Sequence, residues 1–196
     1  KGFYKRYAEL IMKLSKSDEE LVSVLSAGIA AGEADINMYQ KLASIYSKQG
    51  NHAKAVQMYE KASQLDTKNV ELISLLGESQ AKSGNTSAAI MTYEQAVAMN
   101  PKANEEYKIL GDLYKKDNKK ESAIKNYKKY LEKNSDNGLA KEVGEFAYSQ
   151  KNYADVIKYL GMVSGAEAEN PSLLKMYADA YYQNKDEAKA FDIYKK

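Results

Sequence analysis

Cysteine is absent from this sequence, and histidine occurs once, as His52. Without thiolates or a second imidazole, the chain has no means of building disulfides, cysteine-based catalysis or a multi-histidine zinc site. We therefore expect no metal and no cofactor, and we interpret His52 as an exposed turn residue. Dinucleotide-binding, P-loop and Gly-x-Ser-x-Gly patterns are also missing, so we expect no catalytic residues and no enzyme.

Arginine is scarce as well, because Arg6 is the single arginine among 29 basic residues. Against 27 acidic residues this leaves a net charge of +2, which gives no reason to expect nucleic acid as a partner. Apolar runs stay far below the roughly 20 residues that span a bilayer, so we expect no direct membrane insertion. A cysteine-free protein suits both cytoplasm and periplasm, and the compartment stays open.

A period of 34 residues runs through most of the chain. Leucine, a small residue, alanine and tyrosine each recur at that interval, and independent positions that share one period indicate a repeat architecture. After one deletion the register continues in Val143-Gly144 and returns in Tyr177-Ala178. The recurring positions are Leu42, Leu76, Leu110; Ala43, Gly77, Gly111; Ala55, Ala89, Ala123; and Tyr59, Tyr93, Tyr127.

Each repeat is predicted to form two helices. In 36–48 and in 55–65, apolar residues fall at spacings of three and four, as they do on one face of a helix. Gly50-Asn51 separates the two segments, because both residues tolerate the positive φ of a helix end. The two prolines, Pro101 and Pro171, lie at repeat boundaries, where a residue without an N–H can open a helix.

The recurring small residues are expected to let the second helix of each hairpin approach the first closely. A leucine at Gly77 or Gly111 would overpack that contact. Large residues such as Tyr59 and Tyr93 are expected to fill the gap between one hairpin and the next.

The succession Leu76-Gly77, Gly84, Ala89, Tyr93, Ala96, Pro101 resembles the tetratricopeptide repeat consensus. The resemblance implies an all-α fold, a right-handed α-solenoid (superhelix) of about six helical hairpins that bury each other's apolar faces. We expect a single domain over 1–196 that is a piece of a longer chain. Its repeats are assigned to 2–35, 36–69, 70–103, 104–136, 137–170 and 171–196, the last one truncated.

The first repeat departs from the pattern. Glu9 stands where a small residue belongs, and Gly28 stands where the next repeat has Ala62. We expect residues 2–35 to form an atypical hairpin with a shifted packing angle.

In this family the first helix of each repeat lines a concave groove, chiefly with its second, fifth, ninth, twelfth and thirteenth positions. Carried onto this chain, the fifth positions are lysines in the C-terminal half and the ninth positions are mostly acidic. The candidate partner-binding residues are Gln40, Ser44, Glu78, Lys108, Asp112, Lys141, Glu145, Tyr148, Lys175, Asp179 and Tyr182.

Two interpretations of these charges stay open. Pairs such as Lys108 with Asp112 and Lys141 with Glu145 stand four residues apart and can neutralise one another, each contributing only about 0.3–0.5 kcal/mol. Alternatively, the ladder orients a mixed-charge peptide along the groove. Tyr148 and Tyr182 suit either an anchoring or a packing role.

Four other uses are disfavoured. The clamp that chaperone-binding relatives use for a carboxylate needs asparagine where this chain has Asp112, and the asparagine ladder of sugar-transferring relatives is missing too. The small-residue and tyrosine pattern differs from that of RNA-binding pentatricopeptide repeats. The lysine-rich segment 115–129 is interleaved with acids, as on a solvated face.

The resemblance thus implies a non-catalytic scaffold or adaptor that binds a peptide or a partner protein in its groove. The alternative is a structural or self-assembling spacer within a larger bacterial envelope or secretion-associated protein, because residues such as Phe191 and Tyr194 would leave apolar surface exposed.

Overall fold

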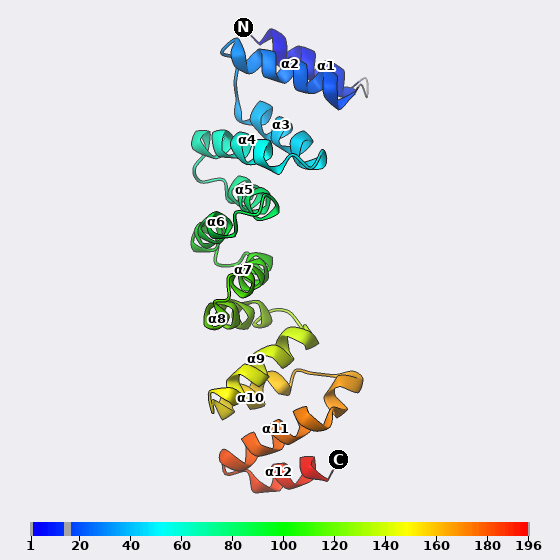
Figure 1. Cartoon of the computed structure of the whole chain (residues 1–196), viewed down its shortest axis with the longest axis vertical. Helices are drawn as coiled ribbons and strands as arrows, with labels where there is room; N and C mark the ends of the chain where they lie inside the picture. Colours follow the sequence, from blue (N-terminus) through cyan, green and yellow to red (C-terminus); the bar gives the residue numbers. More distant parts are fainter. Residues whose placement is uncertain (1, 14–16, 196) are drawn as a thin grey trace. The chain divides into compact units, whose positions relative to one another are not determined.

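The computed structural model of the chain describes residues 2–13 and 17–195. In that part of the chain there are twelve α-helices, one short 3-10 helix and no strand (Figure 1). The expected all-α, solenoid-type fold class is confirmed. The elements are α1 (Phe3–Lys13), α2 (Asp18–Ala30), α3 (Ile36–Lys48), α4 (His52–Leu65), α5 (Val70–Lys82), α6 (Thr86–Met99), α7 (Asn104–Lys116), α8 (Lys120–Leu131), α9 (Asn137–Ser149), α10 (Tyr153–Leu160), η1 (Gly165–Glu169), α11 (Pro171–Gln183) and α12 (Glu187–Tyr194).

Residue contacts divide the chain into two compact units, Lys1–Glu106 and Tyr107–Lys196. In the first unit each helix packs against its neighbour in sequence, from α1 to α5 and on to α6. In the second unit α8 to α12 do the same, and α9 also contacts α11. A single continuous domain over the whole chain stays a prediction. No helix of the described residues is both long enough and apolar enough to span a bilayer.

The five turns between the helices of a hairpin, from α3–α4 to α11–α12, share one backbone conformation. Each ends its first helix with a residue at positive φ, which is 74° at Gly50 and 86° at Gly84 but 58° at Asn118, where a side chain is present. Non-glycine residues pay roughly 1 kcal/mol or more for that conformation. The same position is occupied by Lys151 and Lys185, with φ of 55° and 64°.

The residue after this turn caps the second helix. Asn51 accepts a hydrogen bond from the Lys54 N–H at 3.2 Å, and Asn85, Asn152 and Asp186 make the equivalent bond in their own hairpins. Lys119 takes this position before α8 and provides no side-chain cap. A side-chain oxygen here satisfies one of the free N–H groups of a helix start, so α8 alone of these helices begins without that bond.

The small residues bring the two helices of a hairpin together, as expected. A Cβ built on Gly111 would lie 2.2 Å from Cε1 of Tyr127, and one on Gly77 would lie 2.9 Å from Cε2 of Tyr93. Each tyrosine ring therefore covers the glycine of its own hairpin. Tyr93, which was expected to fill the space between successive hairpins, thus also packs within its own hairpin.

The first hairpin inverts this arrangement. Its close approach is at Gly28 on the second helix, where a Cβ would lie 2.5 Å from Cε of Met38 and 2.8 Å from Cβ of Tyr4. The large residue thus comes from the first helix and the small one from the second. Glu9 is tolerated in place of a small residue because it is exposed in this hairpin.

Glu33 fastens α1 to the rest of the first unit. Its carboxylate accepts hydrogen bonds from the backbone N–H groups of Gly2 at 2.6 Å, Phe3 at 3.3 Å and Tyr4 at 3.1 Å. Burial raises the pKa of Glu33, but these three donors outweigh it, so the pKa lies below its ordinary value. A carboxylate from the linker between α2 and α3 therefore serves as the cap that α1 lacks locally.

The two prolines behave differently from each other. Pro171 occupies the first turn of α11, as expected. Pro101 lies in the turn before α7, which begins three residues later at Asn104, so it does not open a helix.

Candidate functional site

Three neighbouring cavities lie along α3 in the first unit. The first, of about 310 Å³, lies between α1 and α3; the second, of about 300 Å³, and the third, of about 270 Å³, lie between α3 and α5. The first and second share Asn37 and Lys41, and the second and third share Ser44, Tyr59 and Leu75. We call the three together the α3 groove.

The α3 groove contains three of the residues expected to bind a partner. Gln40 and Ser44 line its second cavity, and Ser44 and Glu78 line the third. The sequence interpretation missed Asn37 and Lys41, which link the first two cavities. Asn37 occupies the second position of its repeat, which the family rule includes, so that signal was available.

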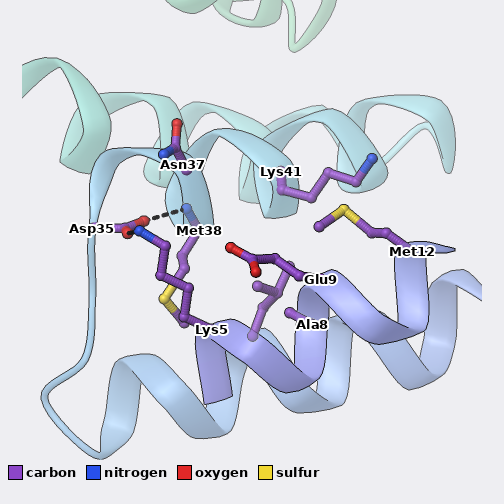
Figure 2. A pocket seen from close by; sticks show the side chains of 9 residues that line it. Lys5, Ala8, Glu9, Met12, Asp35, Asn37, Met38 and Lys41 are labelled. Atoms are coloured by element: carbon purple, nitrogen blue, oxygen red, sulfur yellow. Dashed lines mark hydrogen bonds and ion pairs between the residues drawn. The ribbon is translucent and has the colours of Figure 1, made fainter. Parts of the chain in front are cut away.

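The first cavity has an apolar bottom and a charged rim (Figure 2). Ala8, Leu25 and Met38 are buried, with exposures of 2 %, 2 % and 3 %. Met12, which is 42 % exposed, lines the same cavity. The rim residues are Lys5, Glu9, Asp35, Asn37 and Lys41.

One side of that rim is an ion pair. Lys5 Nζ lies 2.8 Å from Asp35 Oδ2, and Asp35 Oδ1 accepts from the Met38 N–H at 2.9 Å (Figure 2). The hydrogen bond with Asp35, its charge and the more distant charge of Glu9 raise the pKa of Lys5. Asp35 is thus held by both helices that border the cavity.

The α3 helix itself carries lysines and no acidic residue. Within residues 2–13 and 17–195, neither Lys41 nor Lys48 forms a hydrogen bond or an ion pair. In the third cavity, Lys82 Nζ lies 2.5 Å from Glu78 Oε1, so the nearest acid to Lys48 in that cavity is already partnered. Among the described lysines that line the α3 groove, the two without such a partner therefore both belong to α3.

Several candidate residues of the second unit already have partners within the chain. Lys108 Nζ lies 3.3 Å from Asp112 Oδ2, which is the intrahelical pairing expected from the sequence. Lys141 instead pairs with Glu167 of η1 at 2.5 Å, which corrects the expected pairing with Glu145. The reason is that η1 brings a carboxylate from the following loop to the same ammonium group.

Tyrosine hydroxyl groups donate hydrogen bonds to two of the acidic candidate residues, Asp112 and Asp179. Tyr127, which is fully buried, donates to Asp112 Oδ1 at 2.8 Å. Tyr148 donates to Asp179 Oδ2 at 2.6 Å, and Tyr194 donates to Asp179 Oδ1. Burial raises the pKa of Asp179, but the two hydroxyls and the charge of Lys175 outweigh it and leave the pKa lowered.

Of the two candidate aromatic anchors, Tyr148 is partly buried and packs edge-on against Tyr153, with ring centroids 6.5 Å apart. Tyr182 is 56 % exposed and is the one with free ring surface. The two residues expected to behave alike thus differ, because only Tyr148 faces a neighbouring acid.

In the lysine-rich segment 115–129, several lysines pair with acidic residues. Lys115 pairs with Glu142 at 2.7 Å, Lys128 with Asp155, and Lys129 with Glu132 at 3.0 Å.

His52 differs from its expectation. It is half-buried at the start of α4, and its Nδ1 atom is buried with no hydrogen-bond partner. The described residues contain no group of three or more histidine, aspartate or glutamate side chains that could hold a metal ion, with His52 or without it.

Comparison with known proteins identifies the repeats. Residues 46–111 match one tetratricopeptide repeat family model, and residues 109–137 match another. The chain is a tetratricopeptide repeat protein. Repeats of this family serve as protein-interaction modules, typically without catalysis, and the chain is a scaffold of that general kind.

Solved structures share the fold at low sequence identity. A tetratricopeptide repeat protein from Parabacteroides merdae is 18 % identical, with a TM-score of 0.63 over 97 % of this chain and 75 % of its own. YrrB, described as having an unusual peptide-binding site, is 16 % identical, with a TM-score of 0.60 over 86 % and 88 %. MamA is 19 % identical, with a TM-score of 0.58 over 82 % and 88 %. No curated protein matches the sequence.

Proposed function

We propose that this tetratricopeptide repeat protein is a non-catalytic scaffold that holds an extended segment of a partner protein on the first helices of its hairpins. The observation that carries the proposal is the α3 groove, which is hollow, contains Gln40, Ser44 and Glu78, and carries two unpaired lysines. Concave surfaces with a few convergent polar groups are the usual form of binding sites. YrrB, with the same fold, has a peptide-binding site.

The second unit contributes a different surface to the proposal. Its lysines at 108 and 141 are paired within the chain, so a partner's acidic side chain would have to compete with Asp112 and Glu167. Replacing an ion pair within the chain by one with the partner adds little to the binding free energy, because an exposed ion pair contributes only about 0–1 kcal/mol. We therefore assign Lys108, Asp112, Lys141, Glu145, Lys175 and Asp179 a secondary role in orienting the partner, with Tyr182 as its exposed aromatic contact.

The test uses random twelve-residue peptides displayed on phage and selected on the full chain. A photo-crosslinking amino acid is placed at Ser44, and in a control protein at Gln57, which is exposed on α4 and lines none of the three cavities. We expect selected peptides to crosslink at position 44 and not at 57. Equal crosslinking at the two positions, or no selected peptide, would contradict the groove model.

Self-assembly is a second candidate because aromatic surface is exposed on the last hairpin. Tyr182, Phe191 and Tyr194 are 56 %, 59 % and 53 % exposed. Light scattering over a concentration series tests it, and a mass that stays that of one chain at every concentration removes this candidate.

A further inference from the structure

The first cavity of the α3 groove is shaped to accept an aliphatic side chain. Its bottom consists of Ala8, Leu25 and Met38, without a polar atom that would demand a partner, and Met12 forms part of its wall. At about 310 Å³ it lies at the lower end of ligand pockets, which run from roughly 300 to 1,000 Å³. Methionine side chains adapt their shape to an apolar guest.

This cavity exists because the first hairpin packs in the inverted manner. Gly28 leaves the space into which Met38 settles, since a Cβ on Gly28 would lie 2.5 Å from the Met38 terminal methyl. The Lys5–Asp35 ion pair, with Glu9 beside it, borders one side of the opening. Three other hairpins instead pack Tyr93, Tyr127 or Leu160 of the second helix against a glycine of the first helix, so the inverted contact beside this cavity belongs to the atypical hairpin.

Beyond the cavity, the free charges of the groove are positive. Lys41 lines the first and second cavities and Lys48 lines the third. They are separated by seven residues, or about 10.5 Å along a helix. An extended peptide covers that distance in about three residues, at roughly 3.3 Å each. Glu9 lies beside the Lys5–Asp35 ion pair on the rim of the first cavity, where its carboxylate repels an acidic residue and so favours an apolar one.

We infer that the α3 groove selects an extended peptide in which one aliphatic residue fills the cavity between α1 and α3 and two acidic residues about three positions apart contact Lys41 and Lys48. The inference deepens the proposed function and rests on it. Apolar burial supplies the anchor, and the two lysines set the register and exclude basic peptides.

The experiment measures binding of the full chain to an array of ten-residue peptides. Each carries leucine, methionine, isoleucine or alanine as the anchor, with glutamates spaced by one to five positions, and matched peptides carry lysine in place of glutamate. We expect leucine, methionine and isoleucine to exceed alanine by about tenfold. The best glutamate spacing should be three, with no binding of the lysine peptides and weaker binding at high salt.

Two pairs of variants locate the effect. N37W places an indole at the mouth shared by the first two cavities, and K41E reverses the free charge; each should weaken the best peptide by about tenfold or more. Q57W and K61E make the same changes at exposed positions of α4 outside the groove and should leave affinity within about twofold. Circular dichroism confirms that all four variants fold.

The outcomes separate the inference from the proposed function. If selected peptides crosslink at Ser44 but show no anchor or charge preference, or if N37W and K41E bind as well as their controls, the inference is wrong and the groove function stands. If no peptide crosslinks at Ser44, the proposed function fails with it.

Discussion

The buried hydroxyl of Tyr127 donates to Asp112, a residue that the repeat pattern assigns to the partner-binding face. The two are 15 residues apart, and the same interval joins Tyr194 to Asp179 in the last hairpin. In these two hairpins the acidic ninth position accepts a hydrogen bond from a tyrosine of the second helix. This gives part of the acidic column a structural reason that is independent of any partner.

Removing the acceptor, Asp112, should lower the free energy of unfolding more than removing the donor hydroxyl of Tyr127. D112A leaves the Tyr127 hydroxyl buried without a partner, at about 1–3 kcal/mol, whereas Y127F leaves an exposed carboxylate in water and costs about 0.5–1.5 kcal/mol. Urea unfolding of both variants and of D112A/Y127F measures this. K108A removes only the surface ion pair and serves as the control, with a change of about 0.5 kcal/mol or less. A double variant that costs the sum of the singles would show that the two residues do not interact.

Gly111 and Gly77 should respond differently to alanine. Alanine favours a helix over glycine by roughly 1 kcal/mol, but its Cβ at 111 would meet the buried Tyr127 ring at 2.2 Å, against 2.9 Å for Tyr93 at 77. We expect G111A to destabilise the protein by about 1–3 kcal/mol and G77A by clearly less. Thermal melts of the two variants decide, and G111A melting at or above the temperature of G77A would contradict the packing account.

The missing cap of α8 offers a stabilising change. K119N places asparagine where Asn51, Asn85 and Asn152 cap their helices, on a backbone with φ −97° and ψ 70° that is close to theirs. We expect a gain of about 1 kcal/mol in the free energy of unfolding. K125N, on the exposed middle of the same helix, should instead lose a few tenths of a kcal/mol, about the difference in helix propensity. A gain of equal size at both positions would rule out capping as the cause.

Asp179 should make the last hairpin sensitive to acid. Its pKa is lowered in the folded state, so its contribution is complete above the unfolded pKa of about 4 and is lost as the pH falls through the lower folded value. Below about pH 4, D179N should therefore lose less stability per pH unit than the parent protein. Urea midpoints between neutral and acidic pH test this, with D192N on the exposed face of α12 as the control, expected to follow the parent curve.

Glu33 should control the opening of α1. E33Q removes the charge that accepts from three backbone N–H groups of Gly2, Phe3 and Tyr4. We expect faster amide hydrogen exchange in α1, with the second unit unchanged as an internal reference. E60Q, an exposed position on α4, is the matched control. Unaltered exchange in α1 would show that the carboxylate is not what holds its N-terminus.

The sequence was sufficient for the repeat length, the helical hairpins and the close contacts, because these follow from local chemistry repeated at one interval. A glycine at position 77 or 111 indicates that the two helices of a hairpin approach closely, and Gly50-Asn51 indicates a turn. Both indications are independent of the surrounding residues. Gln40 and Ser44 were assigned to the candidate site in the same way, by their place in the period.

What only the tertiary structure decided is which charges are left free and where space remains. Lys141 and Lys41 look equivalent in the sequence, but Lys141 meets Glu167 from a loop 26 residues away, while no acid reaches Lys41. The cavity beside α1 likewise depends on the inverted contact of Gly28 with Tyr4 and Met38. Ion pairs and cavities arise from side chains that different elements bring together, and a periodic pattern carries no information about those distances.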